Sequence, residues 1–419
     1  MPGRLGGLRA SCRVGGWAEE KSFVSQYSVR PCAPALPVST SCYLLVTCRP
    51  PLRLYSRSLY LALHFYDWRS VMADKIRIGI IGAGGYSKSR HIPGFQKLPD
   101  VEVVAVANRS VASAKAVTDQ FGIPEALDDW RRIIERKDID AVLIGTPPNV
   151  HREITLAALA AGKHVLCQTR IAPTPEDALA MHDAAEAAKD RGILTMLIPP
   201  GPFYKGRRFV QHLVESGYTG KLRQVMAFNL SASFADAETP LTVGRNDLEL
   251  YGPYHGSSIG LAYDTMMPWT GPATRVIAHR STWTPERPKT EGGPLAKAPY
   301  PEETSVISET AGGAVVMNVM NSAIRFAESR YELYGEDGSV VYQSRGDTIL
   351  GARKGDEKLQ PLPIPPEHDN PWLIEQEFIS LLRGEVTEPS FSFWDGVLNA
   401  RYLEAVYRSG AEGGWVDLS

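Results

Sequence analysis

The sequence of 419 residues contains little cysteine, no excess of basic charge and no long apolar run. Four of its 5 cysteines lie in the first 48 residues, so the rest of the chain, with Cys167 alone, cannot form an internal disulfide. That usage favours the reducing cytoplasm. The net charge of -2 provides no basic field for nucleic acid or a membrane surface. No segment approaches the roughly 18 apolar residues that cross a bilayer.

The first 71 residues differ in composition from the rest of the chain. They carry 9 Lys and Arg against 3 Asp and Glu, and without them 36 basic and 44 acidic residues remain, a net charge of -8. Such a basic, acid-poor stretch can be a transit peptide. We favour the alternative that Met72 is the true start and that 1–71 is an over-extended, unstructured leader.

From Lys75 to about residue 200, short apolar runs alternate with helix signals. Ser110 and Gly122 bracket an expected helix over 111–121, a second is expected over 151–161, and Thr174-Pro175 opens a third that runs to 190. The apolar runs are continuous, as in strands buried on both faces of a parallel sheet. We therefore predict an α/β, doubly wound Rossmann domain over 72–200. Its expected strands are 76–81, 103–107, 141–144, 164–167 and 195–198, with a short sixth near 125–126.

After about Gly201 the pattern favours strands joined by glycine turns. Two hairpins are predicted, one joining 305–310 to 314–320 and one joining 331–334 to 339–342. A C-terminal α+β domain over 201–419 with an open, mainly antiparallel sheet follows from them. Helices are expected over 207–216, 372–383 and 394–409, with a Pro-rich linker over 361–371.

A glycine-rich turn, Gly82-Ala83-Gly84-Gly85-Tyr86-Ser87, lies between the first strand and the first helix. Gly82 allows the tight turn, and Gly84 lets the backbone approach a diphosphate that meets the helix N-terminus. The third small position is Ser87, which still permits close packing. In this strand–turn–helix context the motif predicts dinucleotide binding, with Gly85 and Tyr86 also at the cofactor.

The end of the second strand indicates which dinucleotide binds. NAD-specific sites usually carry an acid there for the ribose 2′-hydroxyl, whereas this chain has Asn108-Arg109-Ser110. Because Arg can pair with a 2′-phosphate, we expect NADP in preference to NAD. The alternative is that Arg109 is a solvated turn residue and that either cofactor binds.

Loops after the next two strands complete the expected cofactor site. Thr146-Pro147-Pro148-Asn149-Val150-His151 follows the strand 141–144, at the edge where ligands bind to such sheets. Thr146, Pro147 and Asn149 are expected to contact the dinucleotide, and Gln168 follows the strand 164–167. His151 is either a ligand contact or a structural residue at the start of its helix.

The whole of 75–419 resembles the glucose-fructose oxidoreductase / inositol dehydrogenase (Gfo/Idh/MocA) family. The resemblance is carried by the segments 78–87, 139–151, 160–165, 217–220, 335–339 and 395–416. Membership implies a Rossmann domain followed by an open sheet, through which members often form homo-oligomers. It also implies hydride transfer to or from a sugar, a polyol or a related small carbonyl compound.

Two catalytic motifs of that family are altered in this sequence. Where members usually carry Glu-Lys-Pro, this chain has Gln168-Thr169-Arg170. In the second motif Ser257 and Leu261 replace an Asp and a His, and Asp264 alone remains. Neither Thr169 nor Leu261 can exchange a proton at a useful pKa, so the usual proton-transfer group is missing.

Other residues can take over the missing role. Arg170 can hold a carboxylate or polarise an oxygen, and Tyr263 can donate a proton if a nearby cation lowers its pKa. His255, Asp264 and Lys205 are further candidates, although each can equally be a core, loop or solvated residue. No metal site is indicated, because the histidines and acids are too sparse.

The preferred interpretation is an NADP-preferring oxidoreductase of a sugar-like substrate. Two alternatives stay open. The first is a regulatory or scaffold protein that binds a dinucleotide without the chemistry. The second is a lyase or hydrolase that uses tightly bound NAD.

Overall fold

The structure is a computed structural model that describes residues 75–199, 205–242, 247–254, 259–369 and 373–418. The interpretation of residues 1–71 falls outside those ranges, and so does the expectation for His255. None of the helices in the described ranges is long and apolar enough to span a membrane.

The first sheet is parallel and six-stranded, with the order β3-β2-β1-β4-β5-β6. Every neighbouring pair in it is parallel, which confirms the doubly wound prediction, including the short strand at its edge. The carboxyl ends of β1 and β4 lie side by side where the strand order reverses, and ligands bind at that point in such sheets. The strands are β1 (Ile76–Ile81), β2 (Val101–Ala107), β3 (Glu125–Leu127), β4 (Ala141–Ile144), β5 (His164–Cys167) and β6 (Thr195–Leu197).

The helix boundaries in this part of the chain follow from local chemistry. The Ser110 side chain accepts a hydrogen bond from the backbone N–H of Ser113, Gly122 ends the same helix at φ +66°, and Thr174 accepts from the N–H of Asp177. The helix after the glycine-rich turn begins with a π-helical turn, η2. The elements are η2 (Ser87–His91), α1 (Ile92–Gln96), α2 (Val111–Phe121), α3 (Arg131–Glu135), η3 (Pro148–Val150), α4 (His151–Ala160) and α5 (Pro175–Lys189).

The second sheet has nine strands in the order β16-β15-β14-β13-β7-β12-β11-β8-β17. Only β7 and β12 pair in parallel, so the sheet is mainly antiparallel, and both predicted hairpins are present. The central strand β7 was not predicted as a strand, and neither were β8, β15, β16 and β17. The bounds are β7 (Leu222–Leu230), β8 (Ala273–Ser281), β11 (Glu303–Thr310), β12 (Val315–Asn321), β13 (Arg330–Gly335), β14 (Gly338–Gln343), β15 (Thr348–Arg353), β16 (Gln360–Pro361) and β17 (Val416–Asp417). A separate small ribbon pairs β9 (Glu286–Pro288) with β10 (Leu295–Lys297).

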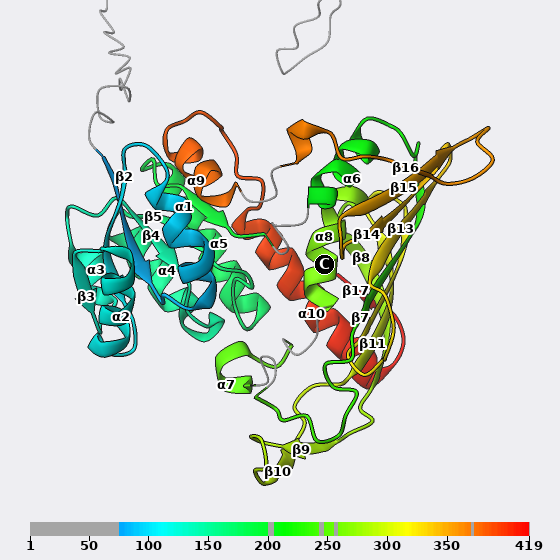
Figure 1. The fold of residues 1–419 in the computed structure, drawn as a ribbon, viewed down its shortest axis with the longest axis horizontal. Helices are drawn as coiled ribbons and strands as arrows, with labels where there is room; N and C mark the ends of the chain where they lie inside the picture. The colour runs from blue at the N-terminus through cyan, green and yellow to red at the C-terminus, as the bar shows by residue number, and fades with distance from the viewer. Residues whose placement is uncertain (1–74, 200–204, 243–246, 255–258, 370–372, 419) are drawn as a thin grey trace, which may run out of the picture. The chain divides into compact units, whose positions relative to one another are not determined.

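Helices cover one face of this second sheet (Figure 1). They are α6 (Lys205–Glu215), α8 (Ile259–Thr270) and α10 (Phe393–Glu412). Only Leu261 and Pro268 of α8 are less than fully buried. A helix that is apolar all round has no amphipathic period to reveal it in a sequence, which is why α8 was not predicted.

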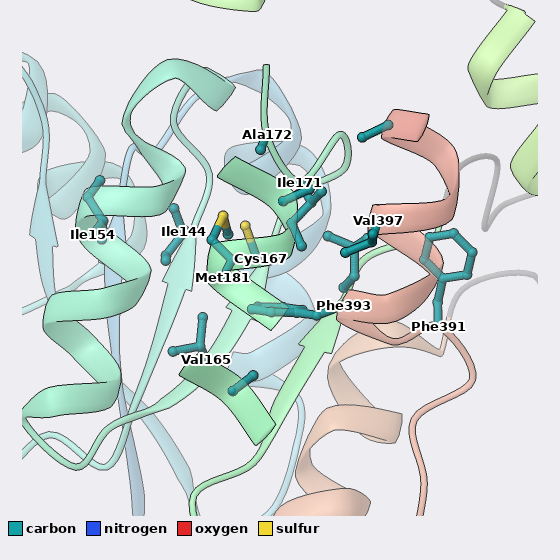
Figure 2. Close-up of a cluster of buried hydrophobic side chains, with 14 of the residues drawn as sticks. Ile144, Ile154, Val165, Cys167, Ile171, Ala172, Met181, Phe391, Phe393 and Val397 are labelled. Atoms are coloured by element: carbon teal, nitrogen blue, oxygen red, sulfur yellow. The ribbon is translucent and has the colours of Figure 1, made fainter. Parts of the chain in front are cut away.

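The C-terminal helices return to the first sheet. Helix α9 (Ile374–Leu382) places Phe378 in the same core cluster as Ile78 of β1. The first turn of α10 places Phe393 and Val397 beside Cys167 of β5 (Figure 2). A side chain at Gly396 would lie 2.8 Å from Ile171, so this glycine lets α10 approach the loop that follows β5. The loop that follows β5 is therefore held in place by a hydrophobic core to which both halves of the chain contribute.

Candidate functional site

Two loops meet at the carboxyl ends of β1 and β4. Gly82 has φ +84°, and a Cβ there would lie 2.7 Å from the backbone nitrogen of Thr146. A Cβ on Gly145 would lie 2.6 Å from the Gly82 carbonyl oxygen and 2.8 Å from Oγ of Ser87. Both positions thus require glycine. The requirement at Gly145 was missed, because it arises from contact with a distant loop.

The glycine-rich turn opens onto a surface hollow. A Cβ added to Gly84 or Gly85 would meet no atom within 4 Å. Oγ1 of Thr146, also at the hollow, is buried and has no protein hydrogen-bond partner. A diphosphate fits this hollow for three reasons. Gly84 and Gly85 leave open space beside the backbone, the Thr146 hydroxyl lacks a protein partner, and the N-terminus of the following helix favours an anion. The hollow is lined by Gly84, Gly85, Tyr86, Ser87, Gly145, Thr146, Pro147, Pro148, Gln168, Thr169, Arg170 and Tyr251.

Asn108 supports the glycine-rich turn through two hydrogen bonds. Its Oδ1 accepts from the N–H of Ala83 at 2.8 Å, and its Nδ2 donates to the carbonyl of Ser113 at 3.1 Å. Its amide thus fixes the glycine-rich turn to the start of α2, and a direct contact of Asn108 with the cofactor stays a prediction. Arg109 is exposed beside it, and Ser110 caps α2.

His151 is a structural residue. It is 1% exposed, with Nδ1 3.0 Å from the carbonyl oxygen of Ile171 and Nε2 2.8 Å from that of Thr146. Burial lowers its pKa. His151 ties the loop after β4 to the loop after β5. Of the two alternatives for this residue, a ligand contact or a structural role, the contacts support the structural role. Asn149 is exposed and is not among the residues that line the hollow.

The altered family motif lies at the hollow. Gln168, Thr169 and Arg170 all line it, and Tyr251 reaches it from helix α7 (Leu248–Tyr251). Among the described residues that line the hollow, Tyr251 alone comes from the second half of the chain. No sequence pattern pointed to Tyr251, because its position at the hollow depends on packing between the two halves of the chain.

Tight packing fixes Tyr251. The next residue, Gly252, has φ +81°, and a Cβ there would lie 2.6 Å from Cβ of Pro173. The hydroxyl of Tyr300 donates to the carbonyl of Gly252 at 2.7 Å. Because Pro173 follows Arg170 by three residues, the same contact sets the spacing between Tyr251 and the altered motif.

Arg170 is a buried cation at the inner wall of the hollow, 8% exposed. Asp264 of α8 is fully buried behind it and accepts a 2.6 Å hydrogen bond from Nδ2 of Asn399. Burial raises the pKa of Asp264 well above its usual value, while the positive charges of Arg170 and Arg207 act in the opposite direction. Asp264 does not line the hollow, and the hydrogen bond from Asn399 ties it to α10.

Two catalytic candidates prove to be structural. The Tyr263 ring stacks on Tyr402 at a 4.0 Å centroid distance, and its hydroxyl accepts from the N–H of Ala273 at 3.2 Å. Burial raises its pKa, so the condition under which it could donate a proton, a pKa lowered by a nearby cation, is not met. Lys205 is ion-paired with Asp369, beside the short helix η4 (Pro366–His368), and does not line the hollow.

Comparison with known proteins gives the same assignment as the resemblance. Residues 76–195 match the family model described as an oxidoreductase family with an NAD-binding Rossmann fold. Levoglucosan dehydrogenase from Pseudarthrobacter phenanthrenivorans is 28% identical over 392 residues, covering 82% of this chain and 98% of that protein. A dTDP-3,4-didehydro-2,6-dideoxy-alpha-D-glucose 3-reductase from Streptomyces violaceoruber is 33% identical over 159 residues, 38% of this chain and 44% of that protein.

Solved structures agree over both sheets. An oxidoreductase domain protein from Kribbella flavida superposes with a TM-score of 0.72 at 25% identity, covering 83% of this chain and all of that one. Levoglucosan dehydrogenase in complex with NADH and L-sorbose superposes with a TM-score of 0.71 at 26% identity, covering 83% and 99%. With the strand order and the glycine-rich turn, these matches show that residues 76–195 form an NAD-binding Rossmann fold of the Gfo/Idh/MocA oxidoreductase type, and that the chain is similar to levoglucosan dehydrogenase over most of its length.

Proposed function

We propose that the protein is an oxidoreductase that uses NAD or NADP to interconvert a hydroxyl and a carbonyl group of a sugar, a polyol or a related small molecule. The carrying observation is the hollow itself, which has diphosphate space at Gly84 and Gly85 and polar side chains at Arg170 and Tyr251. The names of the relatives support a sugar-like substrate, since a similar levoglucosan dehydrogenase was solved with NADH and levoglucosan.

Each residue of the hollow has a proposed role. The bound nicotinamide supplies or accepts the hydride. Arg170 binds the reacting oxygen and stabilises negative charge on it, because a buried guanidinium is always protonated. Tyr251, as the phenolate, would accept the proton of the hydroxyl during oxidation, and the phenol so formed would donate it to the carbonyl oxygen during reduction. It replaces the proton-transfer group that Thr169 and Leu261 cannot provide.

The preference for NADP over NAD is part of the proposal. No acid stands at the end of β2, and Arg109 is exposed there next to the N-terminus of α2. A 2′-phosphate at this position would gain from the guanidinium and from the helix dipole.

Self-association through the second sheet is also proposed. Side chains alternate between the two faces of a strand, and on the face opposite to the helical core Ile307 lies in register with Met317 and Ile277. Met317 in turn lies opposite Met226 of β7. Ile307 is 39% exposed. A continuous apolar row across four strands suits an isologous contact with a second copy of the chain.

The experiment combines binding with turnover. Purified protein is titrated with NADH and NADPH by calorimetry and then assayed with each cofactor over a panel of sugars, polyols and hydroxy acids. The proposal expects binding of both and turnover of at least one sugar-like compound. Binding without turnover of any compound would favour the regulatory or scaffold alternative. Cofactor that co-purifies and is recycled within a non-redox reaction would favour the lyase or hydrolase.

A further inference from the structure

A buried pair of titratable side chains stands behind the hollow. His91, the last residue of η2, is fully buried, and its Nδ1 lies 2.6 Å from Oε1 of Glu375 on α9, which is 3% exposed. Nε2 of the same ring lies 3.3 Å from Oε1 of Gln168. The chain of contacts thus joins the C-terminal helix α9 to a residue that lines the hollow.

The packing around Glu375 is built for a carboxylate. A Cβ at Gly94 would lie 2.6 Å from Oε2 and 2.7 Å from Cδ of Glu375, so only glycine leaves room for this group against α1. Ile374 and Phe378 anchor α9 in the core of the first sheet on either side of it. A buried acid is costly unless it is paired, which makes its placement beside His91 a feature to be explained.

With Oε1 of Gln168 toward His91, as the structure places it, and with Glu375 ionised, one arrangement of donors satisfies both contacts of the His91 ring. An ionised carboxylate can only accept, so Nδ1–H of His91 donates to Glu375. The carbonyl oxygen of Gln168 can also only accept, so Nε2–H of His91 donates to it. Both ring nitrogens of His91 then donate, Nδ1 to Glu375 and Nε2 to Gln168. The amide NH₂ of Gln168 is left to point away from His91, where the side chain borders the hollow.

We propose that Glu375 and His91 are positioning residues that fix Gln168 as a hydrogen-bond donor to an acceptor oxygen at the nicotinamide end of the bound cofactor, the carboxamide carbonyl. Without the charge on Glu375, His91 need carry only one proton. Its Nε2 can then accept from Gln168, the amide turns over, and its oxygen faces the cofactor instead. This inference rests on the proposed binding of a nicotinamide nucleotide in the hollow.

The test compares two ligands that share a diphosphate and differ in the nicotinamide. NADH and ADP-ribose are titrated by calorimetry into the full chain and into the variants Gln168→Glu and Glu375→Gln. Gln168→Glu replaces the donor by an acceptor at the surface of the hollow, and Glu375→Gln removes the buried charge without changing its shape. We expect each to weaken NADH binding by roughly tenfold, the size of one hydrogen bond, and to leave ADP-ribose binding unchanged.

A matched control lies on the same helix. Glu377 of α9 accepts a 2.7 Å hydrogen bond from the N–H of Ser390 and does not contact Gln168. Glu377→Gln removes a carboxylate from α9, and the ratio of the two affinities should not change. A purely structural role for the pair would instead lower the melting temperature and affect both ligands alike.

Three results separate the possible failures. If the two ligands weaken in parallel, or if NADH binding is unchanged in Gln168→Glu, the positioning role is wrong while cofactor binding stands. If the unaltered chain binds neither ligand, the proposed function itself fails. If Glu375→Gln does not fold, Gln168→Glu, whose altered group lies at the hollow, still decides whether Gln168 serves as the donor.

Discussion

Replacing Tyr263 and Tyr251 by phenylalanine, one at a time, tests which tyrosine serves the reaction. Tyr263→Phe keeps the stack on Tyr402 at 4.0 Å but removes the hydroxyl that accepts from the N–H of Ala273. Leaving one buried N–H without an acceptor costs about 1–3 kcal/mol. At about 2–4 °C per kcal/mol in a large domain, the melting temperature should fall by several degrees. The rate of turnover should not change, because this hydroxyl does not reach the hollow.

Tyr251→Phe should have the opposite effects: little change in stability and a large loss of turnover. The Tyr251 side chain is half-buried at the hollow, so the change in the free energy of unfolding should stay within about 0.5 kcal/mol. Loss of a positioned proton-transfer group should lower kcat by about 10²–10⁴. Binding of NADH should be unaffected.

Both variants are measured by steady-state kinetics on the best substrate of the panel and by thermal unfolding. A large loss of kcat in Tyr263→Phe with full activity in Tyr251→Phe would refute the assignment of the site. Equal losses of kcat in both variants would refute it as well, because a core tyrosine should not share the effect.

Four further changes give distinct results. Arg109→Glu should shift the ratio of NADPH to NADH affinities toward NADH by about tenfold or more, and an unchanged ratio would remove Arg109 from cofactor selection. Gly206→Ala places a Cβ 2.2 Å from the ring of the fully buried Tyr342 and should destabilise the chain by about 1–3 kcal/mol in urea unfolding, whereas a stabilised protein would contradict the contact. Burial lowers the pKa of His164 from 6.5 to about 4, so the unfolded chain takes up a proton first as the pH falls. The free energy of unfolding should drop by up to about 1.4 kcal/mol per pH unit between those values, and His164→Gln should remove that slope. Ile307→Lys should convert any oligomer into a single-chain species in sedimentation velocity, and an unaffected oligomer would exclude this face.

Local patterns predicted the first half of the fold. Ser110, Gly122 and Thr174 mark helix ends through contacts within three or four residues. Such local contacts can be recognised from the sequence alone. The glycine-rich turn is equally local. The hairpins of the second sheet were predicted for the same reason, whereas β7 was not, because its two partners lie about a hundred residues farther along the chain.

The site could be predicted only in part. The hollow brings together Gln168, Thr169 and Arg170 as expected, but Tyr251 reaches it through the packing of Gly252 on Pro173. The pairing of His91 with Glu375 spans 284 residues, and no spacing rule connects them. Tyr263 was misjudged because a tyrosine in a family motif looks the same in sequence whether its ring packs in a core or borders a cleft.

Asp264 explains how a family motif can keep one residue while its chemistry changes. Its carboxyl group is fully buried, bonded to Asn399 and surrounded by the charges of Arg170 and Arg207. Removing this carboxyl group would leave the buried amide of Asn399 without that acceptor, at a cost of about 1–3 kcal/mol. Packing alone is therefore a sufficient reason for an acid at position 264. Its presence is then no sign of the original catalytic motif, and the proposed function assigns the chemistry to Arg170 and Tyr251, which line the hollow.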